Sequence, residues 1–198
     1  GTSAVLYAKG TLSADTNGLI QIGAGSTTAT GIAVLAGGSL VAHGGVISGE
    51  VLDTGTLSND GALTIMGSVS GAGALVLGSG LVDVRGSVGG QALSFVSPAA
   101  ALRVRGLRGA TTATGFQAGN MIDLAGVATA TLTDTAGGTV LTGGGGTVNL
   151  GIAPAGTAFK LFSDGNGGTE VLLPSAAVAV QTIIAASVQD SGYSATVL

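Results

Sequence analysis

The chain has 198 residues, including 38 glycines and 3 prolines, and its 10 acidic and 6 basic residues give a net charge of −4. An apolar content of 45% argues against a disordered chain, and the negative charge disfavours nucleic acid as a partner. The absence of cysteine excludes disulfides and thiolate metal sites, and the longest weakly polar stretch, residues 175–188, is too short for a membrane-spanning helix.

Apolar-x-apolar triplets recur along the chain and predict short strands that turn one face inward. In chain order they are Ile20–Ile22, Ile32–Val34, Leu63–Ile65, Leu75–Leu77, Leu93–Phe95, Leu102–Val104, Ile122–Leu124 and Val148–Leu150. Most are followed within a few residues by glycine, which predicts an alternation of strands and tight turns. Because glycine weakens regular elements, its abundance also argues against long helices.

A repeat of about 20 residues can be read along the chain. One strand core per repeat gives separations of 20, 23, 18, 21, 20, 18 and 19 residues for the series Ile20, Leu40, Leu63, Leu81, Leu102, Ile122, Val140 and Phe159. Such a period is typical of a solenoid, in which each coil forms about three strands stacked roughly 4.8 Å above those below.

The expected fold is therefore an all-β, right-handed parallel β-helix, or β-solenoid, with coils of about 20 residues. We expect about nine coils over residues 1–174, with residues 175–198 forming a terminal strand pair, a cap or the start of another module. The competing fold is an antiparallel β-sandwich, which normally has more large aromatic residues than the 4 Phe, 2 Tyr and no Trp present here.

Two stretches resemble known bacterial surface proteins. Within residues 31–80, GIAVLAGGSLVAHGGVISGEV and TGTLSNDGALTIMGSVSGAGALVLGSG resemble the glycine-rich repeats of autotransporter passengers and haemagglutinin-like adhesins. Within residues 73–173, GFQAGNMIDLAGV and FSDGNGGTEVLL resemble a segment of large surface or secreted Gram-negative proteins. The resemblance implies a β-helical adhesin module of a longer protein, with no catalytic residues to carry over. Asn120 stands where the family phrase more often has Asp, which puts any cation binding at that position in doubt.

Four of the six basic residues fall within 24 positions of one another. Arg103 and Arg105 alternate along a predicted strand and share its outward face, while Arg85 lies 18 residues before Arg103, close to one coil. Stacking would join Arg85, Arg103, Arg105 and Arg108 into a basic stripe suited to carboxylated or sulfated polysaccharide. The alternative is an ordinary solvated face.

Three other features of the sequence are candidate sites. Asp164 and Asn166 are the candidate ligands if calcium binds, but they lack the spacing of an EF-hand, and a hairpin turn between residues 159–162 and 171–173 is favoured. His43, the only histidine, is predicted to be a surface residue without a carboxylate neighbour. The four glycines of Gly143–Gly146 are not followed by Lys-Ser/Thr, which excludes a phosphate-binding loop. No other metal and no cofactor is expected.

These observations predict a structural or adhesive module rather than an enzyme, secreted or displayed on a bacterial outer surface. Its partners would be polysaccharide, a host surface or sister chains, held by many weak contacts. One alternative is a polysaccharide-degrading β-helix enzyme, which three or more carboxylates or basic residues in one groove would favour, whereas a smooth face of Thr, Ser, Ala and Gly would favour the adhesin. The other alternative is a self-assembling extracellular matrix or filament protein.

Overall fold

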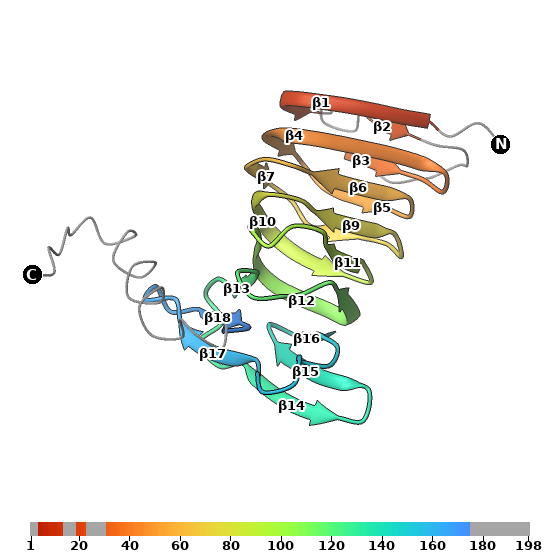
Figure 1. The fold of residues 1–198 in the computed structure, drawn as a ribbon. Coiled ribbons are helices and arrows are strands. Elements are labelled where there is room, and N and C mark those ends of the chain that lie inside the picture. The colour runs from red at the N-terminus through yellow and green to blue at the C-terminus, as the bar shows by residue number, and fades with distance from the viewer. Residues whose placement is uncertain (1–3, 14–18, 23–30, 175–198) are drawn as a thin grey trace, which may run out of the picture.

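The computed structural model describes residues 4–13, 19–22 and 31–174, and these form an all-β structure (Figure 1). The strands are β1 (Ala4–Ser13), β2 (Leu19–Ile22), β3 (Gly31–Val34), β4 (Gly38–Ser48), β5 (Val51–Asp53), β6 (Thr56–Asn59), β7 (Leu63–Ile65), β8 (Val69–Ser70), β9 (Ala74–Leu77), β10 (Gly80–Gly89), β11 (Ala92–Phe95), β12 (Ala100–Thr114), β13 (Met121–Leu124), β14 (Thr131–Thr135), β15 (Gly138–Gly143), β16 (Gly146–Asn149), β17 (Lys160–Ser163) and β18 (Thr169–Leu172). The described part contains no helix, and the predicted terminal element at residues 175–198 lies outside it.

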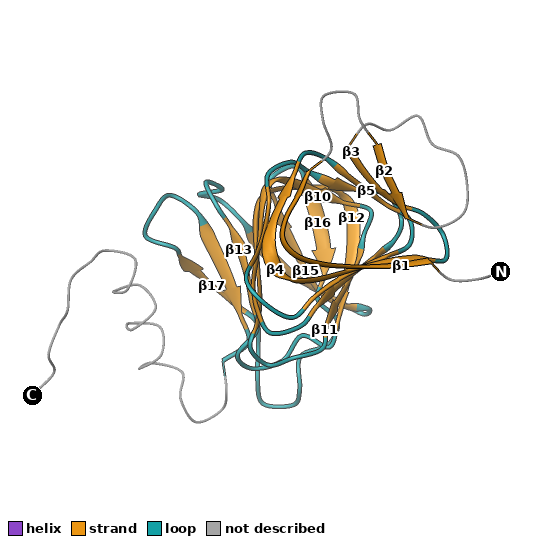
Figure 2. Ribbon diagram, turned by 90° about the horizontal axis from the view of Figure 1, so that it is seen from above, coloured by secondary structure: helices purple, strands orange, loops and turns teal. Residues whose placement is uncertain are grey.

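Parallel coils about 19 residues apart build a β-solenoid of about five turns, which confirms the expected fold. Figure 2 looks down this stack and shows the strands arranged around a shared interior. Each full coil contributes a strand to three faces in turn. The first face contains β3, β5, β8 and the last residues of β10. The second face contains the start of β4, then β6, β9, β11 and the end of β12. The third face contains the end of β4, then β7, the starts of β10 and β12, and finally β13.

Aliphatic columns run through the interior because equivalent positions of successive coils carry similar side chains. On the second face Leu40, Leu57, Leu75 and Leu93 follow one another in register, and all four are fully buried. Each lies between outward residues, as the apolar-x-apolar triplets predict. Burying one such side chain contributes about 1.5–3 kcal/mol, so the columns hold the coils together.

The expected number of coils was wrong, because the parallel stack ends near β13. Beyond it the chain forms antiparallel pairs: β14 with β15, β15 with β16, β17 with β18, and β18 with β13. One parallel pair remains there, because β16 also lies alongside the later part of β12. Short glycine-rich loops connect β14 to β15, β15 to β16 and β17 to β18, and short loops suit antiparallel neighbours, whereas parallel pairing needs a longer connection. The stack therefore gives way to hairpins below β12 (Figure 1).

The strand cores chosen from the sequence do not all share one column. Leu63, Leu102 and Ile122 do lie on the third face, where the column between Leu63 and Leu102 is completed by Val82 rather than by the chosen Leu81. Leu40 belongs to the second face. The two last choices, Val140 and Phe159, lie in the hairpin region. In so apolar a sequence, a near-regular series can mix different faces of the coil.

The run Gly143–Gly146 has a structural role in this region. It forms the turn between β15 and β16, and both Gly144 and Gly145 have positive φ angles, of 61° and 94°. A Cβ on Gly144 would lie 2.9 Å from the Cα of Gly106 in β12, which is too close for any side chain. The glycines therefore let this turn pack against the last coil.

Candidate functional site

A ladder of charged residues crosses the third face. Asp83 of β10 is in register with Arg103 of β12, which is in register with Asp123 of β13. Arg103 Nε donates to Asp123 Oδ2, and Arg85 Nε forms an ion pair with Asp83 Oδ2 at 2.9 Å. The ladder therefore places an arginine between two carboxylates.

The two carboxylates of this ladder are shielded from solvent. Asp123 is fully buried, and the side chain of Asp83 is only 10% exposed. Burial raises the pKa of Asp123, while Arg103 lowers it and the negative charges of Asp164 and Asp83 raise it further. Neither carboxylate is an open acid or base at the surface, and their partners are arginines of the protein itself.

Arg85 and Arg105 form a second row of outward side chains on the third face, next to the ladder, and a β-bulge positions them. Val84 pairs with Val104, but the next pair is Ser87 with Gly106, so Arg85 and Gly86 together lie opposite Arg105. A bulge inserts one extra residue and re-aims the side chains beside it. Arg85 and Arg105 are both exposed, and Arg105 has no hydrogen-bond or ion-pair partner among the described residues.

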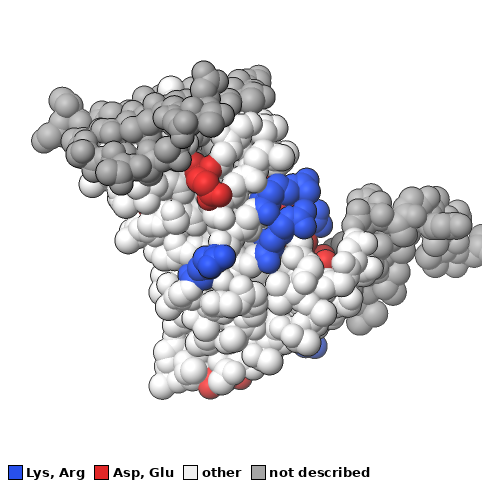
Figure 3. Space-filling view, turned by 180° about the vertical axis from the view of Figure 1, so that it is seen from behind, with Lys and Arg blue, Asp and Glu red and all other residues white. Residues whose placement is uncertain are grey.

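The predicted basic stripe is only partly brought together. Arg85, Arg103 and Arg105 lie on neighbouring strands of the third face, whereas Arg108 lies beyond the bulge, opposite Gly89, where its Nε donates to Ser87 Oγ at 3.0 Å. On the side of the molecule shown in Figure 3, basic side chains form one large patch with a smaller one apart from it. Sequence reasoning did not pair Asp83 and Asp123 with these arginines, although the 20-residue spacing of Asp83, Arg103 and Asp123 was a usable signal.

The outward side of the second face is smooth and uncharged. One row consists of Ser39, Thr56, Ala74, Ala92 and Thr112 in register across five strands. The next row consists of Val41, Ser58, Val76, Ser94 and Thr114. All ten side chains are half-buried or exposed, and the strands that carry them lie one above another (Figure 1).

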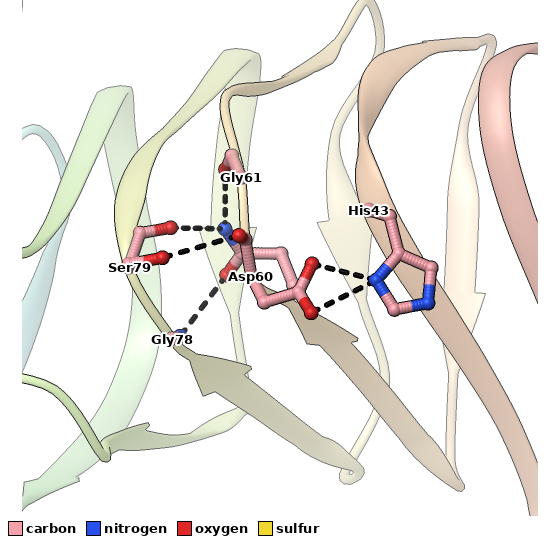
Figure 4. A network of polar contacts seen from close by, with 6 residues as sticks. His43, Asp60, Gly61, Gly78 and Ser79 are labelled. Carbon is pink, nitrogen blue, oxygen red and sulfur yellow. Dashed lines mark hydrogen bonds and ion pairs between the residues drawn. The ribbon is translucent and has the colours of Figure 1, made fainter.

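His43 is on the surface, as predicted, but the expectation that it lacks a carboxylate neighbour was wrong. Its Nδ1 lies 2.7 Å from Oδ1 and 2.8 Å from Oδ2 of Asp60, which belongs to the next coil. Figure 4 shows the two side chains pointing toward one another. Ser79 Oγ donates to the backbone oxygen of Asp60 rather than to the imidazole. The two contacts of Asp60, with His43 and with Ser79, link three successive coils. They do not form a nucleophile-base pair between Ser79 and His43.

The predicted hairpin at Asp164–Thr169 is confirmed. Strands β17 and β18 pair on either side of it, and Asp164 Oδ1 accepts hydrogen bonds at 2.7 Å from the backbone N–H groups of Asn166 and Gly168. The carboxylate thus satisfies the turn's own backbone. Within residues 4–13, 19–22 and 31–174, no group of three or more His, Asp or Glu side chains is arranged to hold a metal ion.

Asn120 is a buried structural residue. Its Nδ2 donates to the backbone oxygens of Ser97 at 2.6 Å and Ala100 at 3.2 Å, and its Oδ1 accepts from the N–H of Gln117 at 2.9 Å. An amide supplies both donors and acceptor, whereas an ionised carboxylate could not donate. The asparagine at this position is therefore explained by hydrogen bonding.

An open cavity of about 300 Å³ lies beside the β17–β18 hairpin. Its lining includes Ala128, Leu161, Phe162 and Thr169 and contains no charged side chain. The charged ladder of the third face does not contribute to it.

Comparisons with protein-family models, with curated proteins and with solved structures found no match to this chain. The resemblance to adhesins therefore extends, on structural grounds, only to the repetitive β-solenoid. Among the described residues there is no helix long and apolar enough to cross a membrane.

Proposed function

We propose that this domain is a structural and adhesive module of a secreted or surface-displayed bacterial protein. The observation that carries the proposal is the smooth second face, whose uncharged rows repeat from coil to coil. Its partners would be neutral glycans, a host surface or sister chains, bound through many weak contacts. The cysteine-free, strongly repetitive sequence is consistent with export but does not by itself require it.

The physical advantage of this face lies in its small side chains and regular spacing. Ser, Thr and Ala lose little rotamer entropy when a partner covers them, and hydroxyl groups can donate and accept hydrogen bonds. Equivalent residues repeat at the strand spacing of about 4.8 Å, so a flat or repetitive partner can contact several coils together. Many copies displayed together would then bind with avidity.

The geometry favours this function over polysaccharide cleavage. Three arginines and two carboxylates do gather on the third face, but both carboxylates are shielded and engaged by arginines. They also lie outside the described cavity. A catalytic pair of carboxylates must reach both sides of a substrate bond, which this arrangement does not offer.

The test uses beads that display many copies of the full 198-residue chain. Adhesion is measured to immobilised neutral glycans, to cultured epithelial cells and to beads carrying the same chain. Ala92→Lys with Thr112→Lys places two long charged side chains on the second face, and the matched control, Thr131→Lys with Thr133→Lys, places them on exposed positions of β14.

We expect the wild-type beads and the β14 control to adhere to at least one surface, and the second-face variant to lose most of that adhesion. Adhesion only to beads bearing the same chain would identify sister chains as the partner. An absence of adhesion to every surface, or equal losses in the two variants, would refute the proposal.

A further inference from the structure

We propose that Arg85 and Arg105 form a binding site for the carboxylate or sulfate groups of an acidic polysaccharide. This site lies on the third face, so it does not depend on contacts made by the uncharged second face. It is also smaller than the stripe of four arginines that the sequence predicts.

Positive and negative charges are unevenly distributed on this face. Arg103 lies between Asp83 and Asp123, and its Nε donates to the buried Asp123, so its charge is compensated within the protein. In the second row, Arg85 and Arg105 occupy the positions on β10 and β12, so no carboxylate lies at those positions. The two carboxylates therefore compensate two of the three arginines, and Arg105 remains without an ion-pair partner among the described residues, beside the half-exposed Arg85.

The two cations are exposed at the bulge. Arg85 and Gly86 lie together opposite Arg105, so the two arginines sit one coil apart, at the strand spacing of roughly 4.8 Å. The Nε of Arg85 is held by Asp83, which orients its guanidinium group, and 46% of the side chain remains exposed. Two cations carried on adjacent strands repel one another, and an anion placed against both would relieve the repulsion.

Arginine is suited to this role because its planar guanidinium group forms bidentate hydrogen bonds with carboxylates and oxyanions. A second cue is Met66, which occupies the equivalent position one coil before Arg85 and is 55% exposed. An apolar side chain next to two cations matches a sugar ring, which presents C–H groups beside its charged substituent. The combination favours an anionic saccharide over a free inorganic anion.

Arg108 provides a matched control on the same strand. It is exposed like Arg105, but it lies beyond the bulge and bonds to Ser87 Oγ. Arg105→Gln and Arg108→Gln each remove one positive charge from β12, so a purely nonspecific electrostatic attraction would weaken by similar amounts in both. Arg105 has no partner among the described residues, so its replacement breaks no described contact.

The experiment measures binding of the full 198-residue chain to immobilised heparin, which carries sulfate groups, and to polygalacturonate, which carries carboxylates. Dextran serves as the uncharged polymer. The proteins are wild type, Arg105→Gln, Arg108→Gln and the double variant Arg85→Gln with Arg105→Gln. Circular dichroism of each variant verifies that the β-structure is retained.

We expect binding to at least one acidic polymer but not to dextran, with an affinity that falls as salt is raised. Arg105→Gln should weaken it by about tenfold, the double variant further, and Arg108→Gln by no more than about twofold, because Arg105 and not Arg108 lies beside Arg85 and can form charged hydrogen bonds with the same anionic group. Binding to heparin alone assigns sulfate, and binding to polygalacturonate alone assigns carboxylate. The proposal fails if folded wild-type protein binds neither polymer, or if Arg108→Gln loses as much affinity as Arg105→Gln.

Discussion

Replacing Asp53 with asparagine removes an ionisable group from the interior of the solenoid. Asp53 ends β5 and is fully buried, with Oδ1 accepting a hydrogen bond from the N–H of Gly55 at 3.0 Å. Its Oδ2 is buried without a hydrogen-bond partner. Burial raises the pKa of Asp53 from its ordinary value of 3.8 to about 6, although backbone hydrogen bonds from Gly55 and Leu57 act in the opposite direction.

The direction of the pH effect follows from proton binding. The folded chain holds the Asp53 proton more tightly than the unfolded chain, so protonation of Asp53 increases the free energy of unfolding. This contribution is fully present below pH 3.8 and declines until the pH exceeds about 6. Each whole step in pKa corresponds to about 1.4 kcal/mol. The raised pKa therefore costs the folded state about 3 kcal/mol at neutral pH.

The Asp53→Asn variant should lack this loss. Between pH 4 and pH 7.5, the wild-type free energy of unfolding should fall by about 2–3 kcal/mol more than that of the variant. The amide adds buried donors that can lack partners, which costs about 1–3 kcal/mol, but this cost is nearly independent of pH. The pH slope therefore isolates the carboxylate more cleanly than stability at one pH.

Urea unfolding followed by far-ultraviolet circular dichroism at both pH values measures the slope. Asp134→Asn is the control, because it makes the same substitution at an exposed position of β14, and a change in slope as large as that of Asp53→Asn would remove the assignment of the effect to Asp53. Asp123 also has a raised pKa, so part of the slope should remain in Asp53→Asn. Equal pH slopes for wild type and Asp53→Asn would refute the reasoning.

Two further substitutions probe the last coil and the hairpins below it. Asn120→Asp should destabilise the fold by about 3–5 kcal/mol at neutral pH, because a carboxylate would face two backbone oxygens in a buried site; an unchanged urea midpoint would contradict this role. Phe116→Ala should cost about 3–5 kcal/mol, because the Phe116 ring lies between those of Phe95 and Phe159 with centroids 4.8 and 5.6 Å away. The thermal midpoint measures this loss, and a drop no larger than that of the outward variant Val76→Ala would count against the edge-to-face contacts of the three rings.

The sequence predicted the neighbours in a candidate site where the spacing of one coil was enough to bring two residues together. Arg85 and Arg105 could be joined from the sequence because stacked coils place residues about 19 apart side by side. The separation of Arg108 was not predictable, because the bulge between Val84 and Ser87 changes the register on that strand. The partner of His43 was missed because Asp60 lies 17 residues away, across a coil boundary that the sequence does not mark.

The sequence by itself determined the solenoid, because triplets such as Leu75–Leu77 bury alternate residues and recur with a period that lets like side chains stack. It also determined the hairpin at Asp164, since the Asn-Gly turn chemistry is local. Only the tertiary structure decided where the parallel stack ends, because parallel and antiparallel strands use the same side-chain alternation. Tertiary structure also decided which charges compensate one another, because ion pairing depends on distances between coils that local residue order does not specify.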